Sequence, residues 1–380
     1  MRIVYAGSPA IAVPALEALA AMALEDPGVL GAPGVPGAPG EASGDVSGGF
    51  ELAALLTNPD SPRGRHGKPE PTDAAAAVSA LGPRFAAARR DPPVLLKPEK
   101  LGAAVRGELE TLKPDLLVSF AYGRIFGPKF LALLPLGGIN IHPSLLPAYR
   151  GPAPIPQAIL NGDRETGISI QRLALQMDCG DILAQERFPL TGRETGAALA
   201  EEMARRAARL LPSVIRGLAA GTLQGRPQNR EGASYCGLLS RDDGKIDWGQ
   251  SARRIEAQVR AYTPWPLSWT VDGERRLCIL GAALEDVGGL GAGALGLAQG
   301  PDIEPGDGPA AGSGRAAPGT VLGVDKERGI LVQTGDGVLV LTVLQYQAKK
   351  ALEWRSFLNG ARDFIGRRLG QGEGAGGNPD

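Results

Sequence analysis

The first part of the chain alternates short, continuous apolar runs with stretches of helical periodicity. The apolar runs cover residues 2–6, 50–57, 115–121 and 138–141. Helical stretches are expected at residues 13–24 and, as a long amphipathic helix that closes this region, at 195–220. Continuous apolar strands separated by helical segments are typical of a parallel sheet covered on both faces. We therefore predict an α/β domain here.

After about residue 225 the pattern changes to shorter strands. These are expected at residues 267–271, 276–280, 319–324, 330–334 and 338–344. Asp272-Gly273 and Asp336-Gly337 are turn signals, and one helix, 252–262, precedes the strands. Several short strands of this kind indicate a small β-barrel or sandwich, of which the five-stranded nucleic-acid-binding barrel is one common type.

Glycine and proline are concentrated in two segments that interrupt these patterns. Residues 27–49 hold eight Gly and four Pro in 23 positions, and residues 287–318 have a similar texture. Such segments bury too little side-chain surface to offset the cost of ordering the backbone. We interpret them as low-complexity inserts in two domains, 1–225 and 226–370, followed by a disordered tail at 371–380.

Composition and charge exclude several classes of protein. Lys and Arg number 40 against 41 Asp and Glu, a net charge of -1 that excludes a uniformly basic nucleic-acid coat. The three cysteines, at 179, 236 and 278, form no CxxC pair, so a disulfide framework or zinc ribbon is not supported and a reducing cytosol fits best. The first residues make a poor signal peptide, and no stretch reads as a membrane span. We expect a soluble, cytoplasmic protein.

Common catalytic motifs are missing or misplaced. The match to G-x-G-x-x-G, residues 291–296, lies inside the second insert rather than between a strand and a helix, which argues against a dinucleotide site. Phosphate-loop, zincin and serine-hydrolase motifs do not occur. Histidine is present only as His66 and His142, so histidine catalysis has two candidates.

Residues 138–183 carry the densest candidate chemistry. Asn140 and His142 are two apart on a predicted strand, so their side chains share a face near its carboxyl end, where ligands bind in open parallel sheets. Asp178 and Asp181 follow the strand-like run 167–172 and are expected to return to the same edge. An amide, an imidazole and a carboxylate suit acyl transfer to an amine. A purely structural histidine and loop-stabilising aspartates are the alternative interpretation.

At these residues the chain resembles the formyltransferases that use 10-formyltetrahydrofolate. Residues 140–147 (NIHPSLLP) are similar to the family's first signature and residues 177–181 (MDCGD) to its second, with Asp178 36 residues after His142. The likeness is greatest to the members that formylate methionine on initiator tRNA. Supporting matches are residues 5–9, 57–60, 121–123, 149–155, 245–248, 262–266 and 335–337. The resemblance implies a Rossmann-like parallel-sheet domain followed by a smaller OB-like, tRNA-binding β-barrel.

The resemblance also implies an activity and its residues. The expected reaction moves a formyl group from 10-formyltetrahydrofolate, a co-substrate, to the α-amino group of methionyl initiator tRNA, giving formylmethionyl-tRNA for translation initiation. Asn140 and His142 are expected to stabilise the oxyanion, and Asp178 to hold His142 in a useful protonation state and help remove the amine proton. Asp181 is the second choice of carboxylate. No metal is expected.

Two further sets of residues follow from the resemblance. The residues expected to line the folate site are Ser144, Leu145, Leu146, Pro147, Tyr122, Gly123 and Ile125. The residues expected to contact tRNA are Arg63, Arg65, Lys68, Lys349 and Lys350. The chain departs from the family where His66-Gly67-Lys68 replaces tandem basic residues and where Ala348 replaces a glycine. From residue 315 to 370, nine Lys and Arg against five Asp and Glu leave a local charge of +4.

Several alternatives stay open. Leu145 and Leu146 could be ordinary core residues, and the basic loop could be merely solvated. The acceptor amine could belong to a sugar nucleotide or a glycinamide, and the protein could be a folate- or RNA-binding module without catalysis. A nicotinamide oxidoreductase is the fold-level alternative, against which the missing glycine fingerprint counts. We expect a monomer without membrane association.

Overall fold

The computed structural model describes residues 1–25, 49–62, 67–285 and 315–371. The chain divides into two compact units. The first comprises Met1–Ile155, Arg164–Thr191 and Ala198–Leu238, and the second Pro156–Asp163, Gly192–Ala197 and Leu239–Asp380. The expected domain boundary between residues 225 and 226 stays a prediction. Nearly all of the two inserts and the tail, and all of the glycine motif at 291–296, lie outside the described residues.

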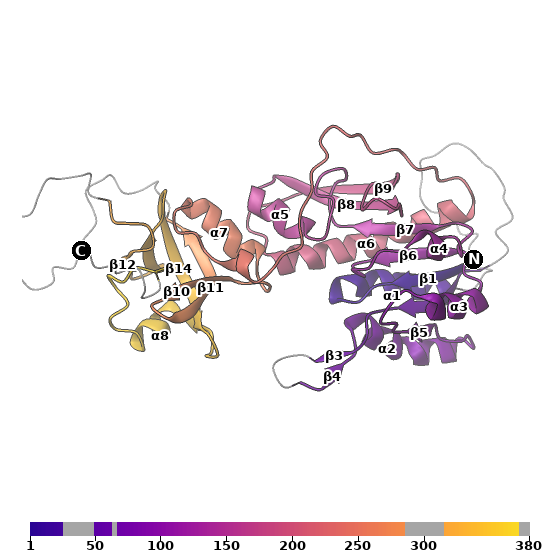
Figure 1. Cartoon of the computed structure of the whole chain (residues 1–380), viewed down its shortest axis with the longest axis horizontal. Helices are drawn as coiled ribbons and strands as arrows, with labels where there is room; N and C mark the ends of the chain where they lie inside the picture. Colours follow the sequence, from indigo (N-terminus) through magenta and orange to yellow (C-terminus); the bar gives the residue numbers. More distant parts are fainter. Residues whose placement is uncertain (26–48, 63–66, 286–314, 372–380) are drawn as a thin grey trace, which may run out of the picture. The chain divides into compact units, whose positions relative to one another are not determined.

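A seven-stranded sheet forms the centre of the first unit (Figure 1). Its spatial order is β5-β2-β1-β6-β7-β8-β9. The strands are β1 (Arg2–Ala6), β2 (Glu51–Leu56), β5 (Val94–Leu96), β6 (Leu116–Phe120), β7 (Gly138–His142), β8 (Glu165–Arg172) and β9 (Ile182–Pro189). β5, β2, β1, β6 and β7 are parallel, which confirms the predicted α/β sheet and brings their carboxyl ends to one edge.

The last two strands of this sheet differ in direction from the other five. β8 runs antiparallel to β7, with Arg172 opposite Ile139 and Ser169 opposite His142, and β9 runs antiparallel to β8. The loop after β8 therefore starts beside the amino end of β7. It folds back, with the Arg172 amide donating to the carbonyl of Asp181 at 2.8 Å. Asp178 thus reaches β7 from the β8–β9 loop and not from the carboxyl end of a parallel strand.

Helices cover this sheet. They are α1 (Val13–Leu24), α2 (Asp73–Ala87), α3 (Ala103–Leu112), α4 (Pro128–Leu131), α5 (Pro154–Asn161) and α6 (Gly196–Ala219), with a 3-10 turn at Ala10–Ala12 and a short strand pair, β3 (Ser61–Pro62) and β4 (Pro69–Glu70). Thr72 caps α2 through its hydroxyl, as expected of an N-cap threonine. On one face of the sheet, Val4 and Leu117 pack with Leu109 of α3 and Phe130 of α4. This packing fixes the strands that carry the site.

The second unit contains an antiparallel sheet in the order β10-β11-β14-β13-β12, with β15 beside β14. Its elements are α7 (Ala252–Ala261), β10 (Ser268–Asp272), β11 (Arg275–Leu284), β12 (Val321–Asp325), β13 (Gly329–Gln333), β14 (Val338–Tyr346), β15 (Leu352–Glu353), α8 (Trp354–Asn359) and a 3-10 turn at Asp242–Gly244. The five predicted strands and the preceding helix are all present. The finer description as OB-like stays a prediction.

Residues 366–370 lie between the two edge strands of this sheet. On the β12 side, the Val321 amide donates to the carbonyl of Arg367 at 2.8 Å. On the β10 side, the Gly370 amide donates to the carbonyl of Val271 at 2.9 Å. Main-chain hydrogen bonds on both sides satisfy edge groups that an open sheet would leave exposed. We name this stretch the closing segment.

A buried carboxylate anchors the closing segment. The Asp272 side chain is 3% exposed, and Arg367 Nη1 donates to both of its oxygens at 2.8 and 3.0 Å. Arg275 and Tyr346 also donate to Asp272. Burial alone would raise the pKa of Asp272, but the hydrogen bonds from Tyr346 and Arg367 together with the two guanidinium charges lower it below its usual value.

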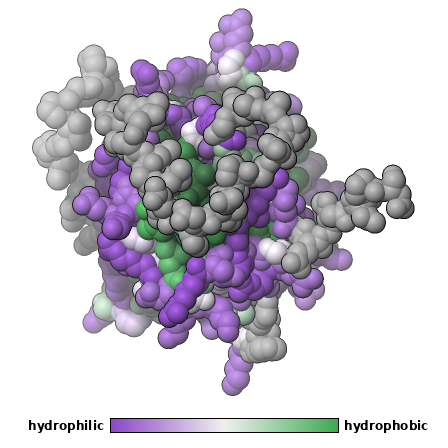
Figure 2. Space-filling model, turned by 90° about the vertical axis from the view of Figure 1, so that its left-hand side faces the viewer, coloured by the Kyte–Doolittle hydropathy of each residue, from purple (hydrophilic) through white to green (hydrophobic). Residues whose placement is uncertain are grey.

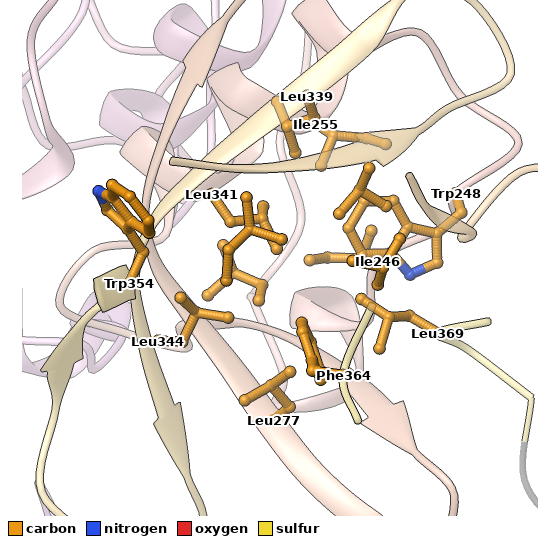
Figure 3. Close-up of a cluster of buried hydrophobic side chains, with 14 of the residues drawn as sticks. Ile246, Trp248, Ile255, Leu277, Leu339, Leu341, Leu344, Trp354, Phe364 and Leu369 are labelled. Atoms are coloured by element: carbon orange, nitrogen blue, oxygen red, sulfur yellow. The ribbon is translucent and has the colours of Figure 1, made fainter. Parts of the chain in front are cut away.

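The core of the second unit joins the sheet to its helices and to the closing segment. The side of the molecule seen in Figure 2 is mostly hydrophilic, with an apolar area near its middle. Figure 3 shows the interior, where Trp248, Ile255, Leu341 and Phe364 come together. Phe364 packs edge-on against Phe357 with ring centroids 5.0 Å apart. The core thus draws on residues more than 100 positions apart.

Candidate active site

Asn140 and His142 lie on β7, near the carboxyl end of the parallel strands. Residues two apart on a strand project from the same face, and both side chains here approach Asp178. His142 is 4% exposed and Asn140 is half-buried. The structure therefore brings the three predicted catalytic residues to one point.

Four groups surround the carboxylate of Asp178. Oδ1 accepts from Gln171 Nε2 at 2.8 Å and from Asn140 Nδ2 at 3.4 Å, and lies 3.6 Å from His142 Nδ1. Oδ2 accepts from the main-chain amide of Gly151 at 2.8 Å. The backbone of Asp178 has φ 52°, a left-handed conformation that aspartate adopts more readily than most residues. These contacts hold the carboxylate in one orientation.

Both ring nitrogens of His142 face oxygen acceptors. Nε2 lies 2.8 Å from the carbonyl oxygen of Tyr149, and Nδ1 faces Asp178 at a distance too long for a good hydrogen bond. Burial lowers the pKa of His142 below its usual value, although the Asp178 charge and the Tyr149 carbonyl partly offset this effect. Burial thus disfavours the protonated imidazole and the two oxygen neighbours favour it, while Nδ1 is turned toward the carboxylate.

The loop after β7 is fixed by its own hydrogen bonds and by a later segment. Ser234 and Cys236 pair with Arg150: the Arg150 amide donates to the Ser234 carbonyl at 2.8 Å, and the Cys236 amide to the Arg150 carbonyl at 2.8 Å. Gly151 has φ +109°, and a Cβ atom there would lie 2.2 Å from the Cys236 carbonyl oxygen. Glycine is therefore needed at 151 for both conformation and space.

The residues expected to line the folate site fall into two groups, beginning with the loop after β7. Ser144 and Leu146 are buried, whereas Leu145 and Pro147 are partly exposed. The Ser144 hydroxyl donates to the Ala148 carbonyl at 2.6 Å, so it stabilises the turn. Contact with a ligand at this loop thus falls mainly to Leu145, Pro147 and main-chain groups.

The second group lies on the loop after β6, the strand next to β7. Tyr122 is 2% exposed and its ring stacks on Phe126 at 5.6 Å, within the core of the first unit. Its hydroxyl is buried and has no hydrogen-bond partner within the described part of the chain. Gly123 is exposed, and Ile125 is 71% exposed. Ile125 therefore presents an exposed apolar side chain at the carboxyl edge of the parallel strands.

The residues expected to contact tRNA are only partly described. Arg63 and Arg65 lie outside the described residues, whereas Lys68 is exposed at the start of β4. In the second unit, Lys349 and Lys350 are exposed at the turn after β14. Ala348 in that turn has φ 61°, which explains why a glycine would suit the position.

The second unit also has a pocket of about 550 Å³ beside the closing segment. Lys245, Asp247, Trp248 and Arg368 are among its lining residues. Two of these side chains are cationic and one is acidic.

Residues that the sequence reasoning missed complete the surroundings of Asp178. Gln171 lies on β8 opposite Asn140, and Gln228 follows α6 in the chain. Ser169 and Gln171 alternate with Ile168 and Ile170 along β8, so a polar side chain in a buried strand was a usable signal. Gln228 stands in a polar stretch at the start of the second predicted domain and had no such signal.

Neither a metal site nor a membrane-spanning helix is present among the residues that the structure describes. No group of three or more His, Cys, Asp and Glu side chains there is placed to hold a metal ion. Within the same residues, no helix combines the length and apolar character needed to cross a membrane.

Comparison with known proteins addresses both halves of the chain. The Formyl transferase family matches residues 42–215, and the Formyl transferase C-terminal domain family matches residues 238–362. The methionyl-tRNA formyltransferase of Treponema denticola is 42% identical over 365 residues, covering 96% of this chain and 98% of that protein. That of Roseiflexus castenholzii is 35% identical and covers 97% and 99%.

Solved structures agree with this at the level of the fold. The N-formyltransferase of Helicobacter canadensis, in complex with folinic acid and dTDP-3-aminofucose, matches with a TM-score of 0.54 and 16% identity. The match covers 91% of this chain and 99% of that one. With both regions matched and full-length relatives above 30% identity, the chain belongs to the formyl transferase family.

Proposed function

We propose that the protein transfers a formyl group from 10-formyltetrahydrofolate to the α-amino group of methionine carried by initiator tRNA. The observation that carries the proposal is the meeting of Asn140, His142 and Asp178 at one point on the sheet. The 42% identity to a methionyl-tRNA formyltransferase over nearly the whole chain supports the choice of acceptor.

In this reaction, attack of the neutral amine on the formyl carbon places negative charge on the formyl oxygen. Asn140 and His142 are the proposed donors to that oxygen. Asn140 bonds to Asp178 only at 3.4 Å, and His142 Nδ1 lies 3.6 Å from the same oxygen, so neither side chain is held to Asp178 by a short bond. Loss of one oxyanion donor typically lowers kcat by about 10²- to 10³-fold.

Asp178 is the proposed acceptor of the amine proton, directly or through a water molecule. Neutral N–H donors from Gln171 and Gly151 hold it, and no cation is bonded to it among the described residues. A carboxylate placed in this way is free to take a proton without breaking an ion pair. General base catalysis of this kind contributes about 10²- to 10⁴-fold.

Formyl-folate is proposed to bind along the loops that follow β6 and β7. These strands are neighbours in the sheet, so their loops lie together at its carboxyl edge. Exposed Ile125 and partly exposed Leu145 offer apolar contacts suited to a flat pterin ring, and main-chain groups of the same loops suit its polar edge. When bound there, the folate supplies the formyl group.

tRNA is proposed to contact exposed cations of both units. Lys68 lies just before β4, and Lys349 and Lys350 belong to the second unit; Arg63 and Arg65, which lie outside the described residues, are included in the proposal from the sequence. Lysine and arginine contacts to phosphates make RNA affinity strongly dependent on salt. Monomeric state and cytoplasmic location stay predictions.

The proposal is tested by incubating the protein with 10-formyltetrahydrofolate and methionylated initiator tRNA and measuring formyl-methionine. Asn140→Ala and Asp178→Asn should each lower kcat by about 10²-fold or more while tRNA affinity is retained. Asp181→Asn is the matched control, because this carboxylate is exposed three positions along the same loop and should keep wild-type activity. Product with a glycinamide or amino-sugar acceptor but none with methionyl-tRNA would overturn the proposed acceptor.

A further inference from the structure

A chain of side-chain hydrogen bonds leads from Arg150 to the carboxylate of Asp178. It starts where Arg150 Nε and Nη2 lie 3.1 and 2.8 Å from Gln228 Oε1. A guanidinium group has donors only, so the atom of Gln228 that faces it must be the oxygen. The orientation of the Gln228 amide is thereby determined, with its NH₂ group on the opposite side.

The NH₂ group of Gln228 meets acceptors from two elements of the site. Nε2 lies 2.8 Å from the main-chain carbonyl oxygens of both Asp178 and Gly180, and 3.0 Å from Gln171 Oε1. Because Gln171 Oε1 accepts from Gln228, the NH₂ group of Gln171 must point the other way. It does so, donating to Asp178 Oδ1 at 2.8 Å.

Every link of this chain therefore has a defined direction, ending on the proposed proton acceptor. Gln228 holds the main chain at Asp178, where φ is 52°, and Gln171 holds its side chain. Gln171 is 1% exposed, so water cannot readily replace a lost partner. The same Oδ1 atom faces Asn140 and His142, so a displaced carboxylate would lose both neighbours.

We propose that Gln228 and Gln171 are positioning residues for formyl transfer, with Gln228 orienting Gln171 and, through it, the carboxylate of Asp178. This inference rests on the proposed function, since it assigns to the two amides the placement of its proton acceptor. Neither side chain touches the reacting atoms. Gln228 acts from the segment after α6, which extends the site beyond the first 225 residues.

Steady-state kinetics separate positioning from substrate binding. Gln228→Met and Gln171→Met remove the hydrogen bonds at similar side-chain length, and each should lower kcat by about 10²-fold, the effect of a misplacement of about 1 Å. KM for both substrates should stay within about twofold of wild type, because no substrate contact is lost. Gln333→Met is the matched control: this buried glutamine of the second unit bonds only to nearby carbonyls, and kcat should not change.

Two further variants test the direction of the chain. Gln228→Glu keeps the shape and still accepts from Arg150, but a carboxylate has no N–H for Gln171 or Asp178, so it should lose about as much kcat as Gln228→Met. It also keeps the test valid if the methionine variants fail to fold. The Gln171→Met, Gln228→Met double variant should lose no more than the larger single loss. Additive losses, or wild-type kcat in Gln228→Glu, would overturn the proposal.

An NMR titration tests positioning without relying on turnover. The chain has two histidines, so His66→Gln leaves His142 as the single imidazole. The Asp178 charge raises the pKa of His142, so moving that carboxylate away by Gln228→Met, which adds no charge, should lower the pKa further. An unchanged titration curve would refute positioning. Absence of product from the wild-type protein would instead refute the proposed function, and the titration would still decide the role of Gln228.

Discussion

Replacing Arg367 by methionine should destabilise the second unit by a predictable amount. Arg367 donates twice to Asp272, a carboxylate whose side chain is 3% exposed, while Arg367 itself is 32% exposed. Breaking a fully buried ion pair costs about 3–5 kcal/mol because it strands the remaining charge. The partial exposure of Arg367 and the continuing contact from Arg275 reduce this, so we expect about 2–3 kcal/mol for Arg367→Met.

The positions of the tryptophans allow thermal unfolding of the second unit to be followed by fluorescence. All four tryptophans of the chain, at positions 248, 265, 269 and 354, belong to the second unit. Tryptophan fluorescence, excited selectively over tyrosine, therefore reports on this unit alone. For a unit of this size, 2–3 kcal/mol corresponds to a fall in Tm of about 5–10 °C. Arg315→Met is the matched control, because Arg315 makes an exposed ion pair at 3.9 Å to Asp336, and Tm should move little.

The pH dependence of the Tm difference between wild type and Arg367→Met tests whether the buried charge of Asp272 causes it. The pKa of Asp272 is lowered in the folded protein, so its ionised form stabilises the fold above its usual pKa of 3.8, and this stabilisation is lost as pH falls through the folded pKa. The Tm gap between wild type and Arg367→Met should narrow as pH falls, because Asp272 without Arg367 protonates at a higher pH than the paired Asp272 of the wild type. A gap equal to that of Arg315→Met at pH 7, or one that stays the same down to pH 3, would refute the reasoning.

Three other predictions concern the site and the proposed RNA contacts. Because burial lowers the pKa of His142 and the Asp178 charge raises it, Asp178→Asn should lower that pKa further in an NMR titration, and an unchanged or higher value would contradict this. Gly151→Ala should lower kcat by about 10²-fold while leaving the fluorescence Tm of the second unit unchanged, since a Cβ would force the loop away from a carbonyl 2.2 Å distant. Replacing both Lys349 and Lys350 by methionine should weaken tRNA binding and reduce the slope of log affinity against log salt by about 1–2, with no change in kcat at saturating tRNA, and an unchanged slope would exclude them from the interface.

Sequence reasoning located most strands and the helices α1, α6 and α7 because their signals are local. The periodicity at 13–24 and 195–220 matches α1 and α6 closely, and each expected strand of the second unit is found. The local sequence does not indicate whether a strand is parallel or antiparallel to its neighbours, because an apolar run has the same pattern in either case. The antiparallel direction of β8 and β9, which determines how Asp178 reaches β7, is therefore known only from the structure. β9 itself is polar at Gln185, Glu186 and Arg187, which hides it from a search for apolar runs.

The candidate site likewise combines residues that local sequence signals indicate with residues that only the structure reveals. The shared face of Asn140 and His142 follows from the two-residue period of a strand, whereas the choice of Asp178 came from a family resemblance. Gln228 could not be found in either way, because its contacts cross 50 residues to Asp178 and 78 to Arg150. Roles that depend on such distant partners require coordinates.

The pairing of Ser234 and Cys236 with Arg150 has a consequence for the order of events during synthesis. The chain leaves the ribosome from its amino end, so Asn140, His142 and Asp178 emerge well before their supporting segment. At about 5–20 residues per second, the stretch from residue 178 to 236 takes several seconds to a fraction of a minute to make. During that interval the nascent protein holds its proposed catalytic residues without the strand pairing that shapes their loop, so formyl transfer should begin only after Cys236 has cleared the exit tunnel.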